Sequence, residues 1–225
     1  MEESQLELME QFILAYSAGD LPAWCYRLWL SLSTVPLFKN EEKQQVRPLG
    51  IRHTLARLAH AEVIGQSMPA IREFLEPLQL GMSRAGPAKL VNMIKGVIEL
   101  HPECVVVAVD IMNCYNEQRR GATVEVLQRT PNLSHLTTFA ATILAPVPAL
   151  ETGGRPWGET PTGFAQGDPS SGAFQAIGLH PSLEKLDQAC KGQEGVGGAV
   201  AGADDTFVWG RPEVVFPALM AYVAL

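Results

Sequence analysis

Two adjacent carboxylates, Asp204 and Asp205, lie between two apolar runs, residues 199–203 and 206–209. Apolar runs separated by a short polar break predict a β-hairpin with both acids at its tip. Adjacent carboxylates repel each other, so a bound cation explains their place on a tight turn better than protein alone, and Mg²⁺ would suit them. The pair is weak evidence by itself, because an Asp-Asp sequence in a solvated turn is common.

A third carboxylate, Asp110, directly follows the valine-rich run 105–109 and should therefore end a buried strand. An aspartate at such a position can also simply cap the loop that follows. Beside the hairpin-tip pair, however, a strand-end acid is what two-metal phosphoryl transfer needs. One ion would activate the attacking hydroxyl, and another, only about 4 Å away, would steady the leaving oxygen.

Length and composition indicate a folded chain with a real core. The 225 residues are 47% hydrophobic, which favours one large domain or two intimate subdomains and excludes a disordered chain. The net charge of −7 repels nucleic acid overall, so any nucleic-acid binding must be local. Residues 27–57 hold six basic residues against Glu41 and Glu42, which places a basic face near the N-terminus.

Cysteine usage and hydropathy predict a soluble, intracellular protein without a membrane span. The four cysteines form no CxxC pair and have no histidines at zinc spacing, so we expect reduced core thiols. Glu2 and Glu3 are the reverse of a signal peptide's basic leader. The longest uncharged stretch, 130–150, contains three prolines and His135, which argues against a transmembrane helix. Nucleus and cytoplasm are not distinguished.

Periodicity and turn residues predict the order of elements along the chain. Helices are expected at residues 9–18, 51–64, 87–101, 124–127, 136–144, 171–186 with an interruption at Pro181, and 214–225. Strands are expected at 30–38 and 46–51, paired as a hairpin around the polar loop 39–45, and at 105–110. The glycine-rich segment 153–167 predicts an irregular loop or a hairpin.

Four segments resemble, in the right order, the motifs of reverse transcriptases, most like those of non-LTR, LINE-like retroelements. They are PLFKN…VRPLGI for the fingers hairpin, VVVAVDIMNCYNEQRR for the first palm motif, GFAQGDPSSGAFQAIGLHPSL for the Gln-Gly-Asp-Pro motif and AGADDTFVWG for the catalytic hairpin. The resemblance implies an α+β right-hand polymerase core with an antiparallel palm sheet backed by helices. The fingers would span residues 1–80 and 117–160, and the palm residues 81–116 and 161–225.

The resemblance also implies the roles of the acids. Asp110, Asp204 and Asp205 would bind two Mg²⁺ ions, with Mn²⁺ as an alternative, and the backbone carbonyl of Ile111 would be an extra ligand. Of the three carboxylates, Asp205 would be the least directly engaged. The partners would be a primed RNA or DNA template and a deoxynucleoside triphosphate (dNTP).

The remaining substrate contacts are implied by the same motifs. Lys39 and Arg47 flank the fingers loop, where cations could fold over the triphosphate, although they could also be ordinary solvated charges. Tyr115 would pack under the sugar and block a 2′-hydroxyl, or else be a core tyrosine. Gln166 and Gly167 would position nucleotide and template.

Some features depart from the family pattern. Gly202 stands where an aromatic residue is usual, and Ser170, Ser171 and Gly172 replace a more apolar stretch, as in a decaying element. Only 15 residues follow Gly210, too few for the helical thumb, so the chain alone should polymerise weakly or not at all without a thumb or other domains of a longer polyprotein. The alternatives are a catalytically silent remnant that keeps the fold and nucleotide or RNA binding, and a palm-fold nucleotidyl cyclase.

Overall fold

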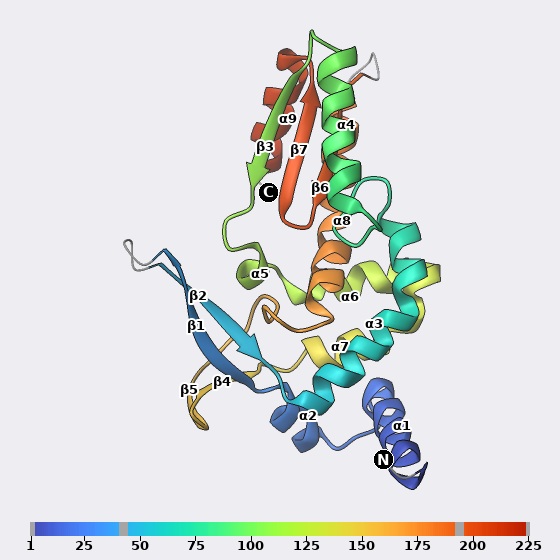
Figure 1. Cartoon of the computed structure of the whole chain (residues 1–225), viewed down its shortest axis with the longest axis vertical. Coiled ribbons are helices and arrows are strands. Elements are labelled where there is room, and N and C mark those ends of the chain that lie inside the picture. Colours follow the sequence, from blue (N-terminus) through green and yellow to red (C-terminus); the bar gives the residue numbers. More distant parts are fainter. Residues whose placement is uncertain (1–2, 41–44, 192–195, 224–225) are drawn as a thin grey trace. The chain divides into compact units, whose positions relative to one another are not determined.

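The computed structural model describes residues 3–40, 45–191 and 196–223, in which helices and strands alternate in an α+β fold (Figure 1). The chain forms two compact units. The first unit combines Met1–Met68 with Tyr115–Gln175, and the second combines Pro69–Cys114 with Ala176–Leu225. The equation of these units with polymerase fingers and palm stays a prediction.

The first unit contains most of the short helices. They are α1 (Glu3–Ala18), α2 (Ala23–Leu30), the start of α3 (Thr54–Leu75), α5 (Cys114–Glu117), α6 (Arg120–Arg129), the 3₁₀ helix η1 (Pro131–Leu136) and α7 (Thr137–Leu144). Helix α1 ends where the sequence predicts, since Gly19 adopts a φ of 83° that favours glycine. Large apolar side chains of these helices, such as Leu127, Leu133 and Ile143, are fully buried and form the core.

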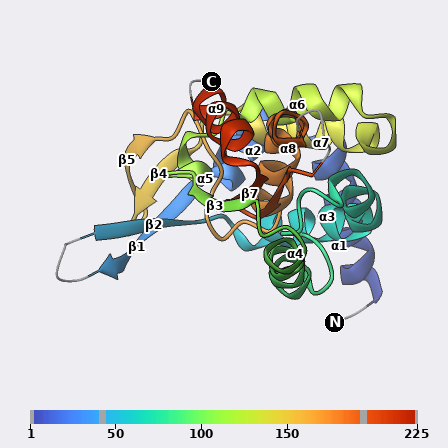
Figure 2. The ribbon, with the colours of Figure 1, turned by 90° about the horizontal axis from the view of Figure 1, so that it is seen from above.

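A four-stranded mixed sheet completes the first unit (Figure 1, Figure 2). Its strands lie in the order β2 (Gln45–Ile51), β1 (Leu32–Asn40), β4 (Ala149–Thr152) and β5 (Arg155–Glu159). Strands β1 and β2 form the predicted antiparallel hairpin. Strands β4 and β5 form a second hairpin in the glycine-rich region, and β4 pairs in parallel with β1. Strand β5 is therefore an edge strand.

The second unit is built on an antiparallel sheet in the order β3 (Val105–Asp110), β7 (Asp205–Gly210) and β6 (Gly198–Gly202). Side chains on one face of this sheet pack with α8 (Ser171–Lys191) and α9 (Pro212–Val223). Helix α4 (Gly86–Leu100) contacts β6 and β3. The antiparallel sheet with helices against it agrees with the predicted fold class.

The predicted interruption of the helix at Pro181 is wrong, because α8 continues through it to Lys191. Pro69 likewise lies inside α3, which extends well beyond the predicted residue 64. A proline inside a helix removes one backbone hydrogen bond and is disfavoured locally. Burial of Leu183 and Leu186 on α8 favours the continuous helix.

The four cysteines are free thiols, three of them buried, as expected for core residues. Within the described residues, no helix is both long enough and apolar enough to cross a membrane.

A buried histidine on α8 makes stability depend on pH. The side chain of His180 is 5% exposed, and its ring centre lies 4.5 Å from that of Phe74. Burial lowers the pKa of His180, although Glu184 opposes this shift. The unfolded chain therefore takes up a proton at His180 more readily than the folded chain, so the free energy of unfolding falls as pH drops below the ordinary histidine pKa of about 6.5.

We expect His180→Leu to lose this contribution, so that its melting temperature falls less between neutral and mildly acidic pH than that of the wild type. His101→Gln is the matched control, because the side chain of His101 is 40% exposed in the same unit, and it should keep the wild-type acid sensitivity. Equal acid sensitivity of His180→Leu and wild type in thermal unfolding would contradict this account.

Candidate active site

Asp110 and Asp205 lie opposite each other at one end of the sheet in the second unit. Asp110, the last residue of β3, pairs in antiparallel register with Asp205, the first residue of β7. Directly opposed residues of such a pair point to the same face, with Cβ atoms about 4.5–5.5 Å apart. Both side chains are exposed. The fold thus brings two of the three acids together, with Asp204 next to them in the turn.

The turn that carries Asp204 is held by a side chain from outside the hairpin. Ala203, before Asp204, has a φ of 64°, a left-handed conformation that costs a non-glycine residue about 1–2 kcal/mol. The side-chain amide of Gln79 accepts a hydrogen bond from the Ala203 N–H at 3.0 Å and donates one to the Ala203 carbonyl at 3.0 Å. Gln79 therefore fixes both polar groups of this strained residue.

The segment around Gln79 also pairs with the hairpin through its backbone. The N–H of Leu80 donates to the carbonyl of Ala201, and the N–H of Ala201 donates to the carbonyl of Leu78, each at 2.7 Å. Gly81 approaches the turn so closely that a Cβ there would lie 2.7 Å from the nitrogen of Ala203. Residues 78–81 therefore form a brace along the outer edge of β6, which we call the edge brace.

We expect Gln79→Ala to lower the free energy of unfolding by about 3 kcal/mol, because it leaves several partly buried backbone groups without partners at about 1–3 kcal/mol each. The side chain of Gln79 is only 1% exposed and also accepts from the N–H of Gly81. Urea denaturation measures the loss. Gln66→Ala is the control, since Gln66 hydrogen-bonds only the exposed Glu62 among the described residues; an equal effect of the two substitutions would refute the bracing role.

Ile111 and Gly202 flank the acids. The carbonyl of Ile111 accepts a hydrogen bond from the N–H of Cys114 at 3.2 Å, and its second lone pair leaves it able to accept a further partner. At Gly202, an added Cβ would lie 3.0 Å from the Cδ2 atom of Leu90 on α4. Leu90 therefore fills part of the space that a side chain at position 202 would need.

The acids have the right donor atoms for Mg²⁺ but are not arranged as a closed metal site. Carboxylate oxygens are the ligands that Mg²⁺ prefers, and Asp110 and Asp205 share one face and one end of the sheet. Among the described residues, however, no three Asp, Glu, His or Cys side chains form a group that could hold a metal ion. The carboxylates of Asp110, Asp204 and Asp205 are nevertheless the kind of donor that suits this ion.

The other predicted substrate residues belong to the first unit, whereas the acids and Ile111 belong to the second. Tyr115 lies half-buried on α5, and its carbonyl accepts a hydrogen bond from the N–H of Phe164. Gly163 packs so tightly against α5 that a Cβ would lie 2.4 Å from that carbonyl oxygen. The loop before Gln166 is thus bound directly to the helix that carries Tyr115.

Arg120 also holds this loop. Its guanidinium donates to the carbonyls of Gly163, Thr162, Thr160 and Pro146. Burial, with a smaller effect of Arg52, lowers the pKa of Arg120 to about 10. The side chain therefore stays charged at neutral pH while it organises the loop.

Gly167 and the two basic residues of the β1–β2 hairpin, Lys39 and Arg47, are described by their backbone. Gly167 has a φ of 99°, and an added Cβ would lie 3.1 Å from Cδ1 of Leu49 on β2. The positive φ of Gly167 therefore favours glycine here, and the nearby Leu49 side chain leaves little room for a larger residue. Lys39 lies in β1 and Arg47 in β2, opposite Leu37. The side chains of Lys39 and Arg47 and the loop residues 41–44 lie outside what the structure describes.

A buried ionic network anchors the Gln-Gly-Asp-Pro loop. Asp168 forms an ion pair with Arg52, whose Nε lies 2.5 Å from the carboxylate, and accepts a hydrogen bond from Nδ1 of His60 at 2.9 Å. The N–H and hydroxyl of Ser170 donate to the same carboxylate. His60 in turn bonds the hydroxyl of Tyr16 at 3.0 Å through Nε2. The network therefore connects Arg52, which directly follows β2, to the loop that carries Gln166.

Electrostatics keep Asp168 ionised. Burial would raise the pKa of Asp168, but the hydrogen bond and charge of His60 and the charge of Arg52 outweigh burial and hold this pKa well below its usual range. Burial is the main cause of the raised pKa of the Tyr16 hydroxyl, so this group stays neutral. Arg52 also donates to the carbonyl of Leu30 at 2.8 Å.

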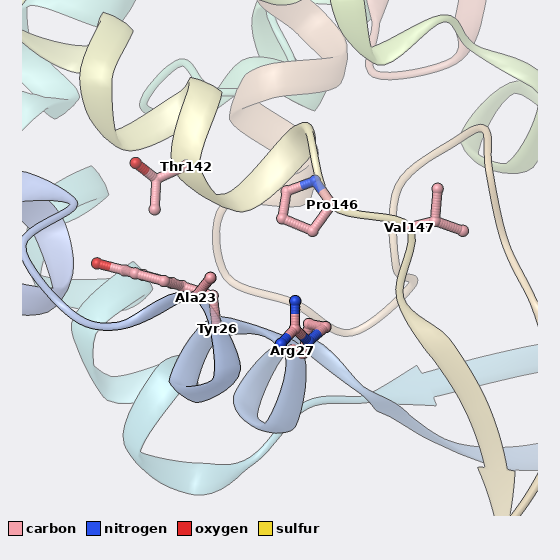
Figure 3. Close-up of a pocket in the computed structure, with 6 residues that line it drawn as sticks. All are labelled: Ala23, Tyr26, Arg27, Thr142, Pro146 and Val147. Atoms are coloured by element: carbon pink, nitrogen blue, oxygen red, sulfur yellow. The ribbon is translucent and has the colours of Figure 1, made fainter.

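Described residues of the first unit line a smaller and a larger cavity. One, of about 170 Å³, is lined by ten residues that include Thr34, Asn116, Trp157 and Gln166. The other, of about 300 Å³, lies between α2 and the end of α7 and is lined by Ala23, Tyr26, Arg27, Thr142, Pro146 and Val147 (Figure 3). The hydroxyl of Tyr26 is already bonded to the carbonyl of Tyr16 at 3.0 Å.

Sequence reasoning missed Gln79, Arg52, His60 and Trp157. Gln79 follows a helix in an irregular segment and carries no motif, so no local signal indicates its contact with Ala203. Arg52 and His60 lie in a stretch that the sequence predicts only as a helix. Asp168 belongs to the Gln-Gly-Asp-Pro motif, but the motif does not indicate its ion pair with Arg52.

Comparison with known proteins shows the fold. No family model and no curated protein matches the sequence. Among solved structures, the chain is similar to apo telomerase from Candida tropicalis truncated from its C-terminal domain, with a TM-score of 0.61 and 9% sequence identity. The match covers 88% of this chain and 47% of that chain, so this chain spans about half the length of the telomerase. The chain thus has a reverse-transcriptase-like fold.

Proposed function

We propose that this chain is the fingers-and-palm core of an RNA-directed DNA polymerase of the non-LTR, LINE-like kind. The observation that carries the proposal is the register of β3 and β7, which sets Asp110 against Asp205 with Asp204 in the adjoining turn. Strand-end and hairpin-tip acids in one place suit two-metal phosphoryl transfer. The structural likeness to telomerase, a reverse transcriptase, supports the fold that such a site needs.

In the proposed reaction, the 3′-hydroxyl of a primer attacks the α-phosphate of a dNTP, and pyrophosphate leaves. Asp110, Asp204 and Asp205, with the carbonyl of Ile111, would hold Mg²⁺, which supplies activation of the hydroxyl and stabilisation of the leaving oxygen when bound. The edge brace and Gln79 would keep the acid-bearing turn in position. The protein contributes position and electrostatics rather than covalent chemistry.

The residues that we propose to contact the substrates belong to the first unit. Tyr115 would lie under the sugar, Gln166 and Gly167 would position nucleotide and template, and Lys39 and Arg47 would offset the charge of the triphosphate. The close packing of the loop against α5 and of Gly167 against Leu49 supports these roles, because it holds the motif residues on fixed backbone.

A catalytically silent remnant is the second candidate. Two observations favour it: the described acids do not form a closed group for a metal ion, and Leu90 takes space beside Gly202 where an aromatic residue would support the hairpin. Such a protein would keep the fold and bind nucleotide or RNA without polymerising it.

Primer extension on matched RNA and DNA templates separates these candidates. A reverse transcriptase adds the dNTP complementary to the template base on RNA as well as on DNA. A remnant binds primer-template in the same buffer but adds no nucleotide. Addition that ignores the template, or product formed from a nucleoside triphosphate without a primer, would indicate a different nucleotidyl transferase.

A further inference from the structure

The larger cavity, of about 300 Å³, has walls that are mostly apolar. Its size lies at the lower end of the range of about 300–1,000 Å³ that is typical of small-molecule sites. Ala23, Pro146 and Val147 contribute aliphatic side chains to the walls. The hydroxyl of Tyr26 already donates to the carbonyl of Tyr16, so Tyr26 offers mainly its ring. The cavity therefore suits the apolar body of a small ligand.

A single cation lies at this cavity. Arg27, in the last turn of α2, is the one charged side chain among the described residues that line it. Figure 3 shows this side chain between α2 and Pro146. Within the described part of the chain, the Arg27 guanidinium forms no ion pair and no hydrogen bond. Its position near the end of a helix is favourable, but its several N–H donors remain available to a ligand.

A neutral hydrogen-bonding group lies on the other wall of the cavity. Thr142 projects from α7, across the cavity from Tyr26 on α2 (Figure 3). Its hydroxyl has no hydrogen-bond partner among the residues that the structure describes, and a hydroxyl can donate to an anion. The cavity thus combines one positive charge, one hydroxyl and an apolar surface, and none of the described lining residues is acidic.

We propose that the larger cavity binds a small monocarboxylate with an apolar body, whose carboxylate pairs with Arg27 and accepts a hydrogen bond from Thr142. The planar guanidinium presents a fork of donors that matches the two oxygens of a carboxylate. The apolar body would lie against the aliphatic walls. This inference does not depend on the polymerase proposal, because none of the residues assigned to that reaction is among the described residues that line this cavity.

The charge of the cavity favours a carboxylate over a phosphate. A phosphate monoester carries roughly −1.5 to −2 charges at neutral pH, which one arginine offsets only in part. A carboxylate carries a single charge, which Arg27 can balance. Because Arg27 is exposed, solvent and salt screen the pair. Binding should therefore be weak, and it should weaken further as the salt concentration rises.

The test is a ligand-observed NMR titration with hexanoate at low ionic strength, and with hexanamide as a neutral analogue of similar size and shape. The wild type should bind hexanoate more tightly than hexanamide. Arg27→Met should weaken hexanoate binding about tenfold, near the lower end of what a charged hydrogen bond contributes, and leave hexanamide binding unchanged. Added NaCl should weaken the binding of hexanoate alone.

Two further variants make the result specific. Arg57→Met is the matched control, because Arg57 is exposed in the same unit but does not line the cavity, and it should bind hexanoate like the wild type. Ala23→Leu adds side-chain atoms at the first residue of α2, in the cavity wall, and keeps a good helix former there. It should weaken hexanoate and hexanamide binding alike. Circular dichroism and thermal unfolding establish that each variant is folded.

Three results would overturn the proposal. Equal hexanoate affinities of folded Arg27→Met and Arg57→Met would show that Arg27 does not hold the carboxylate. A wild type that binds hexanoate no better than hexanamide would show that charge is not recognised. Displacement of hexanoate by inorganic phosphate, beyond the effect of NaCl at the same ionic strength, would show that the cavity does not select a carboxylate.

Discussion

Replacement of Asp168 by alanine is expected to lower the free energy of unfolding by about 3–5 kcal/mol, because it leaves a buried charge without its partner. The side chains of Asp168 and Arg52 are almost completely buried, and the carboxylate also accepts hydrogen bonds from His60 and Ser170. Since a domain is stable by only about 5–15 kcal/mol, this loss should be evident in urea or thermal unfolding.

Controls separate the charge effect from a general loss of side-chain contacts. Glu125→Ala removes an exposed carboxylate from α6 of the same unit and should change stability by about 0.5 kcal/mol or less. The double variant Asp168→Leu with Arg52→Met should be more stable than Asp168→Ala, because no unpaired charge remains. A change in Asp168→Ala as small as that in Glu125→Ala would show that the network does not stabilise the fold.

The same network predicts a response to acid. The folded-state pKa of Asp168 is depressed, so its contribution is present above the ordinary aspartate pKa of about 3.9 and is lost as pH falls toward the folded-state value. Asp168→Ala should therefore differ most from the wild type near neutral pH and least in strong acid.

Asp110→Asn should reduce the rate of nucleotide addition by roughly 10²- to 10³-fold, the usual loss when one electrostatic stabiliser is removed from an active site. The substitution keeps the size of the side chain and removes the charge that would hold Mg²⁺. It lies at an exposed strand end, so the folded state should be unaffected. Single-turnover rates measure the effect, and Glu99→Gln on α4 serves as an exposed control. A near-normal rate in Asp110→Asn would remove Asp110 from the site.

Separate substitution of Asp204 and Asp205 tests which of the two works with Asp110. The family resemblance makes Asp205 the less engaged acid, whereas the strand register places Asp205 directly opposite Asp110. The two arguments therefore disagree on whether Asp204 or Asp205 is the more important metal ligand. Whichever of Asp204→Asn and Asp205→Asn loses more of the rate of nucleotide addition identifies the principal ligand.

The elements that carry the acids could be predicted from sequence because their signals are local. The valine-rich run before Asp110 and the apolar runs on either side of Asp204 specify strands, and the strand register then brings Asp110 and Asp205 together. The β1–β2 hairpin and helix α4 have equally local signals in their turn residues and prolines.

The remaining features depend on contacts between residues far apart in sequence. Gln79 meets Ala203 across 124 positions, and His60 meets Asp168 across 108. Helix α8 passes through Pro181 because its burial outweighs a local preference. Trp157 acquires its setting only when β4 pairs with β1, a parallel pairing that no turn specifies.

The most direct test of the central claim is single-turnover addition of one nucleotide to a primed RNA template, with protein in excess and at low ionic strength. These conditions compensate for weak binding by a chain with a net charge of −7. The account predicts Mg²⁺-dependent addition of the complementary dNTP by the wild type, and addition that is roughly 10²- to 10³-fold slower with Asp110→Asn. A folded wild type that demonstrably binds the primer-template yet adds no nucleotide would contradict it.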